Sequence, residues 1–88
     1  MIDPHGYGRL VRSLDFLVLE VRAAGVDPIG LVLARGFYGG SPTEFLGESL
    51  IALEALLSSS EMFAPSVVAF ADALAQEIRL GFERIGGG

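Results

Sequence analysis

The stretch from Ser41 to Leu57, SPTEFLGESLIALEALL, carries the clearest structural signal in the sequence. Ser41 can cap a helix, Pro42 fits its first turn, and Glu44 stands three residues after the cap, where it completes a capping box. Four leucines then recur at steps of four, three and four, which places one apolar stripe along the helix: Leu46, Leu50, Leu53 and Leu57. Three more apolar residues widen the stripe on one side, namely Phe45, Ala52 and Leu56. A stripe this wide needs several neighbours to cover it, so we predict that this helix is the central helix of a bundle.

Caps and periodicity predict three further helices. An acid followed by proline is a typical helix start, and it occurs at Asp3–Pro4 and at Asp27–Pro28. The first helix is expected to be firm from residue 9 to residue 24, the second to be short and end at Gly36, and the last to run from residue 65 to about residue 85. The fold class is therefore all-α: a compact up-and-down bundle of three long helices and one short one. We expect residues 1–85 to form a single domain and residues 86–88 to be a flexible glycine tail.

The first helix is apolar on two faces. Its inner line consists of Leu10, Leu14, Leu17 and Val21. Phe16 and Leu19 fall on the opposite side, among charged residues. Either the helix sits centrally and buries both faces, or Phe16 and Leu19 form an interface patch with a polar rim of Arg12, Asp15 and Glu20.

The short second helix is apolar nearly all round, from Ile29 to Ala34. A helix of about two turns with so little polar surface is not stable alone, so we expect it between longer helices or against another subunit. The loop after it places Phe37 and Tyr38 between glycines. Aromatic side chains in such a loop either close the end of the core or face a ligand.

The composition is richer in apolar residues than one small core requires. Hydrophobic residues make up 51% of the chain and 12 residues are glycine, whereas apolar residues and glycine together reach roughly 45–50% in soluble domains. Two explanations are open. The bundle is built from many small side chains, or some apolar surface is buried against another chain, either a copy or a different partner.

The formal net charge is −5, and all six basic residues are arginines. Because the arginines are scattered among carboxylates, they do not form the basic stripe that nucleic acid binding needs, so no nucleic acid partner is expected. An acidic surface favours a basic protein as partner. The longest aliphatic stretch, residues 29–34, is far shorter than the ~20 residues that span a bilayer, and the N-terminus does not resemble a signal peptide. We therefore expect no membrane partner and a cytoplasmic location.

The inventory of reactive groups is small. There is one histidine, no cysteine and no lysine, which excludes Schiff-base chemistry, Cys–His dyads and metal sites with two or more histidines. Glu44 and Glu48 share the outer side of the central helix, where solvated acids are expected. Glu54 lies nearer the apolar stripe, and we expect it to pair with Arg22 or Arg79 of a neighbouring helix. No enzyme activity, cofactor or metal is predicted.

The segment Leu46-Gly47-Glu48-Ser49-Leu50 resembles the LG-x-DSL stretch of acyl carrier proteins, which are also small, acidic and four-helical. In that family the serine carries a phosphopantetheine arm at the start of a helix, so the resemblance implies Ser49 as the attachment site. This chain departs from the pattern. Glu48 replaces the aspartate, one residue of the spacing is missing, and the capping box starts the helix eight residues before Ser49.

Three functional hypotheses follow. The leading one is a non-enzymatic interaction protein, such as an inhibitor, an immunity-type protein or an adaptor, that binds another protein, for which a basic one is a candidate. Its expected surface combines Phe16, Leu19, Phe37 and Tyr38 with rim acids Asp15, Glu44 and Glu48. The alternative is a self-associating structural subunit, a homodimer or larger, that uses the first or second helix. The third is a carrier protein.

Overall fold

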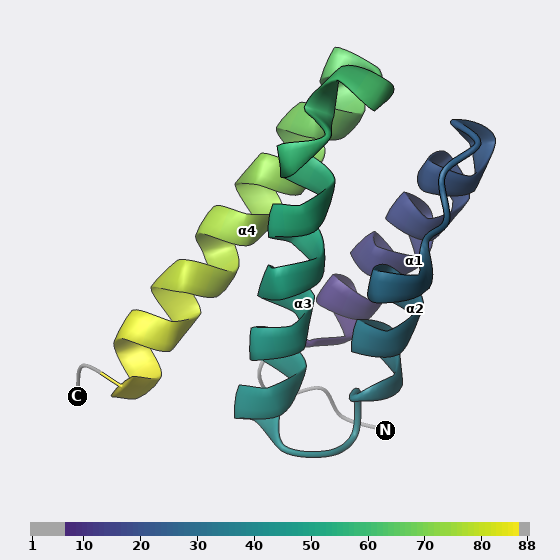
Figure 1. Ribbon diagram of the computed structural model, residues 1–88. Helices are drawn as coiled ribbons and strands as arrows, with labels where there is room; N and C mark the ends of the chain where they lie inside the picture. Colours follow the sequence, from purple (N-terminus) through teal and green to yellow (C-terminus); the bar gives the residue numbers. More distant parts are fainter. Residues whose placement is uncertain (1–6, 87–88) are drawn as a thin grey trace.

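Four α-helices follow one another up and down in the computed structural model, which describes residues 7–86 and, for side chains, residues 7–83 (Figure 1). They are α1 (Tyr7–Ala23), α2 (Ile29–Gly36), α3 (Pro42–Ser58) and α4 (Pro65–Gly86), with a short 3-10 turn, η1 (Ser60–Met62), before α4. The predicted all-α bundle of three long helices and one short one is confirmed. The expected start at Asp3–Pro4 and the last two residues of the glycine tail lie outside the described residues, while Gly86 belongs to α4.

Local signals in the sequence place the helix ends. At the start of α3, the Ser41 hydroxyl accepts a hydrogen bond from the Glu44 backbone N–H at 3.5 Å, and Pro42 occupies the first turn. At the end of α1, Gly25 has a φ of +80°. The N–H of Val26 bonds to the carbonyl of Val21, and the N–H of Gly25 bonds to that of Arg22. This pair of bonds is a Schellman motif, which satisfies the last carbonyls of the helix.

The helices are arranged as a ring. Each one packs against the next along the chain, and α4 also contacts α1, so that α1 and α3 lie on opposite sides of the core (Figure 1). The Cα radius of gyration is 12.6 Å, close to the roughly 12 Å expected for a compact chain of this length. The principal extents of 38 × 26 × 17 Å describe a flattened bundle.

The core is a single apolar cluster to which all four helices contribute. From α1 it takes the predicted inner line, Leu10, Leu14, Leu17 and Val21. From α4 it takes Val67, Ala71, Leu74, Ala75 and Ile78. From α3 it takes Phe45, Leu46, Ser49, Ala52, Leu53 and Leu56.

The buried face of α3 differs from the predicted stripe in where it is centred. Leu50 and Leu57 are only half-buried, whereas Phe45, Ala52 and Leu56 are buried. The reason is that α3 packs between two neighbours. Ala52 lies against Gly30 of α2, and Leu50 and Leu57 lie on the flank of the helix that carries Glu54, toward α4. Burial therefore shifts toward the α2 side of the helix.

The short helix α2 is not enclosed by the longer helices, in contrast to one of the two arrangements expected for it. Only Leu31 and Ala34 are buried, while Ile29, Val32 and Leu33 are exposed. Because α2 lies across the outside of the bundle, between α1 and α3, one side of it meets the core. The other expectation, burial against another subunit, stays a prediction. Within the described part of the chain, no helix combines the length and hydrophobicity needed to cross a membrane.

Candidate interaction face

The outward side of α1 is bounded by two ion pairs. On the α2 side, Asp15 Oδ1 lies 3.2 Å from Arg35 Nε. On the α4 side, Glu77 Oε1 lies 3.7 Å from Arg9 Nη2. These pairs are exposed and contribute little to stability, but they establish which flank of α1 meets which neighbour. The residues between the two flanks point away from the core.

Two large apolar side chains occupy this outward side. Phe16 is 43% exposed and Leu19 is 66% exposed. Both were predicted to lie opposite the inner line of α1, and the structure confirms that position. Of the two arrangements considered for the first helix, burial of both faces is therefore excluded within the isolated chain, because α1 lies at the edge of the bundle rather than at its centre.

The neighbouring helices extend this apolar surface. The rings of Phe16 and Phe70, the latter on α4, lie with centroids 5.1 Å apart and an interplanar angle of 59°. Phe70 is itself partly exposed. On the other flank, α2 exposes Val32 one turn before Arg35, the residue that pairs with Asp15 of α1. We call Phe16, Leu19, Val32 and Phe70 the α1 face.

The structure does not gather all the residues predicted for partner binding. Asp15, Phe16 and Leu19 lie together on α1. Tyr38 is half-buried in the loop between α2 and α3, where its ring meets that of the fully buried Phe45 edge-on at 5.5 Å. Tyr38 thus closes one end of the core, which is one of the two roles predicted for the aromatic residues of this loop. Its neighbour Phe37 is partly exposed.

Glu44 and Glu48 are exposed on α3. Because α1 and α3 lie across the core from each other, their outward sides point in opposite directions, and these two acids are not part of the rim of the α1 face. Phe70 and Val32 are not among the residues predicted for partner binding. No local pattern indicates that the ring of Phe70 meets Phe16 of a helix distant in the sequence.

Charge is distributed unevenly between the two halves of the chain. Residues 1–40, which include α1 and α2, contain four arginines and four carboxylates, a net charge of zero. Residues 41–88, which include α3 and α4, contain two arginines and seven carboxylates, a net charge of −5. The acidity of the protein therefore belongs to the α3–α4 half, and the α1 face lies in a nearly neutral region.

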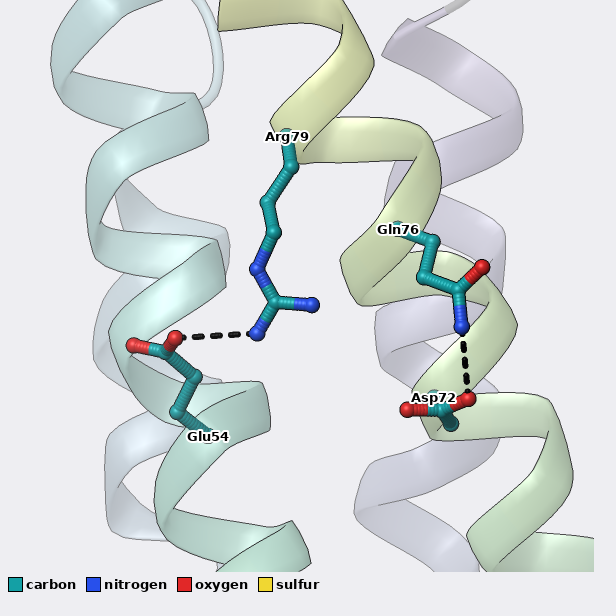
Figure 2. A network of polar contacts seen from close by, with 4 residues as sticks. All are labelled: Glu54, Asp72, Gln76 and Arg79. Carbon is teal, nitrogen blue, oxygen red and sulfur yellow. Dashed lines mark hydrogen bonds and ion pairs between the residues drawn. The ribbon is translucent and has the colours of Figure 1, made fainter.

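The seam between α3 and α4 is polar on its outer side. Figure 2 shows Arg79 of α4 reaching Glu54 of α3, with Nη2 and Oε2 3.0 Å apart. Of the two partners expected for Glu54, Arg79 is confirmed. One turn away on α4, the Gln76 amide donates to Asp72 Oδ2 at 2.8 Å. Solvated polar groups cover this part of the seam, while Ile51 of α3 and Leu80 of α4 are also exposed on these two helices.

A cavity of about 230 Å³ lies between α2 and α3 near the α1–α2 loop. Its lining is mainly apolar and includes Leu31, Ala52, Leu56 and Phe63, with Asp27 among the few polar residues. The Asp27 carboxylate accepts a hydrogen bond from the Ile29 N–H at 3.0 Å, so it satisfies the first backbone donor of α2 from the position before the N-cap, Pro28. Among the residues that the structure describes, no three histidine, cysteine, aspartate or glutamate side chains are grouped as a metal site would require.

Ser49 is fully buried in the core, and its hydroxyl oxygen has no hydrogen-bond partner. A phosphopantetheine arm at this position would have to cross the packed interior, so the geometry argues against the attachment site that the acyl carrier resemblance implies. The side chain is small, which suits a position where α3 faces the rest of the bundle.

Replacing Ser49 with alanine should stabilise the protein. A buried hydroxyl without a partner costs about 1–3 kcal/mol of desolvation, and alanine is also the better helix former. We expect the Ser49→Ala variant to gain about 1 kcal/mol in free energy of unfolding, measured by urea titration as a higher midpoint at unchanged slope. Ser58→Ala is the control, because that exposed hydroxyl already donates to the Ala55 carbonyl at 2.7 Å. A loss of stability in Ser49→Ala would contradict the assignment of an unsatisfied hydroxyl.

Comparison with protein families, with curated proteins and with solved structures finds no match for this chain.

Proposed function

We propose that the protein is a non-enzymatic binding module that presents the α1 face to another protein surface. The observation that carries this proposal is the exposure of Phe16 and Leu19 on a helix whose other side already fills the core. Large aromatic and aliphatic side chains surrounded by charged residues are typical of interaction sites, in which an apolar centre is enclosed by a polar rim. Phe70 and Val32 support the proposal by extending the apolar centre over three helices.

The charge distribution refines the kind of partner. The overall charge of −5 predicts a basic partner, but the α1 face belongs to the half of the chain whose net charge is zero. Apolar contact rather than charge attraction therefore supplies the affinity at this face. Long-range attraction for a basic protein comes from the α3–α4 half, with its net charge of −5, and would be weakened by salt.

Site-specific photo-crosslinking in cells that express the protein tests this proposal. Benzoylphenylalanine in place of Leu19 should yield a defined crosslinked band, because that side chain would be buried in the complex. The matched control is the same group in place of Ile51, which is 61% exposed on α3 and lies outside the α1 face. Mass spectrometry then identifies the captured chain.

The expected result is crosslinking at position 19 that is much stronger than at position 51. Equal crosslinking at both positions, or none at position 19, would contradict the proposed function. The variants are comparable because both positions are exposed and neither contributes to the core.

A further inference from the structure

The α1 face carries a pattern of charges that is complementary to itself. Arg12 lies one turn before Phe16, and Glu20 lies one turn after it. On the flank nearer α2, Asp15 lies one turn before Leu19, and Arg22 follows it by three residues. Opposite charges therefore stand at opposite ends of the apolar centre, with Arg12 and Glu20 on either side of Phe16 and with Asp15 and Arg22 along one flank.

Most of these charges are available for an external partner. Within the described residues, the side chains of Arg12, Glu20 and Arg22 form no ion pair, whereas the other three arginines with described side chains each have a carboxylate partner. Asp15 shares its carboxylate with Arg35 but is exposed. Of the arginines with described side chains, the two without an ion pair, Arg12 and Arg22, therefore both lie on α1.

We infer that the α1 face packs against the α1 face of a second copy of this chain, with the two α1 helices antiparallel around a two-fold axis. This inference rests on the proposed function and names its partner. In that arrangement Arg12 of each copy approaches Glu20 of the other, and Asp15 of each copy approaches Arg22 of the other. Four ion pairs then surround the apolar centre.

The positions of the four pairs are compatible with one axis. The Arg12–Glu20 pairs are centred on residue 16, and the Asp15–Arg22 pairs are centred between residues 18 and 19. Suppose that the two-fold axis passes midway between these centres. At about 1.5 Å rise per residue, the two residues of each ion pair are then offset along the helix axis by no more than about 4 Å. The long arginine side chains span that displacement.

Charge disfavours the other arrangements of two copies. A parallel pair of α1 helices would place Arg12 level with the Arg12 of the second copy, so like charges would meet. Pairing through α3 and α4 would bring together two surfaces from the half of the chain that carries a net charge of −5. Antiparallel pairing through α1 keeps the two acidic halves on the outside of the dimer.

The size of the face sets the expected strength of the dimer. A helix of 17 residues is about 25 Å long, and neighbours at about 8–10 Å make the face roughly 20 Å wide. Two copies would therefore bury roughly 1,000 Å² in total, at the lower end of specific interfaces. We expect a dissociation constant in the micromolar range, so that monomer and dimer exchange.

Sedimentation equilibrium from about 1 μM to about 1 mM measures this directly. The wild-type chain should pass from monomer to dimer. Leu19→Glu should raise the dissociation constant by more than about 100-fold, because it places a carboxylate in the apolar centre of both copies. Ile51→Glu, the matched control on α3, should leave the dissociation constant within about twofold. Circular dichroism checks that both variants keep the helical content of the wild type.

Charge reversal tests the antiparallel direction. Arg12→Glu alone and Glu20→Arg alone should each raise the dissociation constant about tenfold, because each places like charges together at two sites. The double variant should return to within about twofold to threefold of the wild type, since both pairs are re-formed with exchanged signs. The antiparallel arrangement would be overturned if neither single variant changed the dissociation constant. It would also be overturned if the double variant raised the dissociation constant by the combined effect of the two single variants.

Two outcomes separate this inference from the proposed function. A wild-type chain that stays monomeric throughout the concentration range overturns the second copy as partner. If position 19 then crosslinks to a different protein in cells, the proposed function stands and only the partner is wrong. Dimerisation that Leu19→Glu leaves intact overturns the α1 face as the dimer contact.

Discussion

Replacing Phe45 with alanine should remove about 3–5 kcal/mol from the free energy of unfolding. Phe45 is the largest of the side chains that are almost completely buried, and it lies in the first turn of α3, near the end of the core that Tyr38 closes. Both tyrosines of the chain rest against it: Tyr7 of α1 at 5.9 Å between ring centroids and Tyr38 at 5.5 Å, each edge-on. The loss therefore combines a cavity with two broken aromatic contacts. A small domain has only about 5–15 kcal/mol of stability in total, so this variant should lie near the limit of folding.

Tyrosine is a convenient probe of this change, because the chain has no tryptophan. The near-ultraviolet circular dichroism of both tyrosines should weaken in Phe45→Ala, together with a lower urea midpoint. Phe37→Ala is the control, because Phe37 is partly exposed in the neighbouring loop and should cost less than about 1 kcal/mol. Equal losses in the two variants would contradict the central role of Phe45.

A second large loss of stability is expected for replacement of Leu17, and Leu19 on the same helix is the control. Leu17 is fully buried, whereas Leu19, two residues later, is the most exposed large apolar side chain of that helix. Leu17→Ala should cost about 2–5 kcal/mol through the lost contacts and the cavity that remains. Leu19→Ala should change the stability of the monomer by no more than about 0.5 kcal/mol.

Thermal unfolding at low micromolar concentration makes this comparison in the monomer. For a domain of this size, each kcal/mol corresponds to about 4–8 °C in Tm, so Leu17→Ala should melt well below the wild type and Leu19→Ala close to it. At high concentration the wild type should gain stability through dimerisation, and Leu19→Ala should gain less. A destabilised Leu19→Ala monomer would show that this side chain belongs to the core.

Much of the fold could be predicted because the sequence signals that determine it are local. The cap at Ser41, the stop at Gly25 and the inner line of α1 each depend on residues within a few turns of one another, and all three appear in the structure as expected. The opposite placement of Phe16 and Leu19 follows from helical periodicity alone. These features are encoded within single helices.

The features that escaped prediction depend on how helices meet. The exposure of α2 and the shifted burial on α3, where Leu50 gives way to Ala52, are set by the position of one helix relative to its neighbours. The contact of Phe16 with Phe70 joins residues distant in the sequence. The predicted combination of Phe16 with Glu44 and Glu48 assumed a common surface, but the ring of helices places α1 and α3 on opposite sides. Periodicity identifies the faces of a helix but not the neighbour that covers each face.

The order of the ring also has a consequence for the speed of folding. Because each helix packs mainly on the one that follows it, most native contacts join segments that are close in the sequence, and only the contact of α4 with α1 connects the two ends of the chain. Helical bundles dominated by local contacts fold in microseconds to milliseconds, since little loop entropy is lost before contacts form. The chain can build its structure hairpin by hairpin, and the closure of α4 on α1 carries the largest entropic cost. The Phe16–Phe70 contact lies at this last closure, so the α1 face is completed only when the bundle closes.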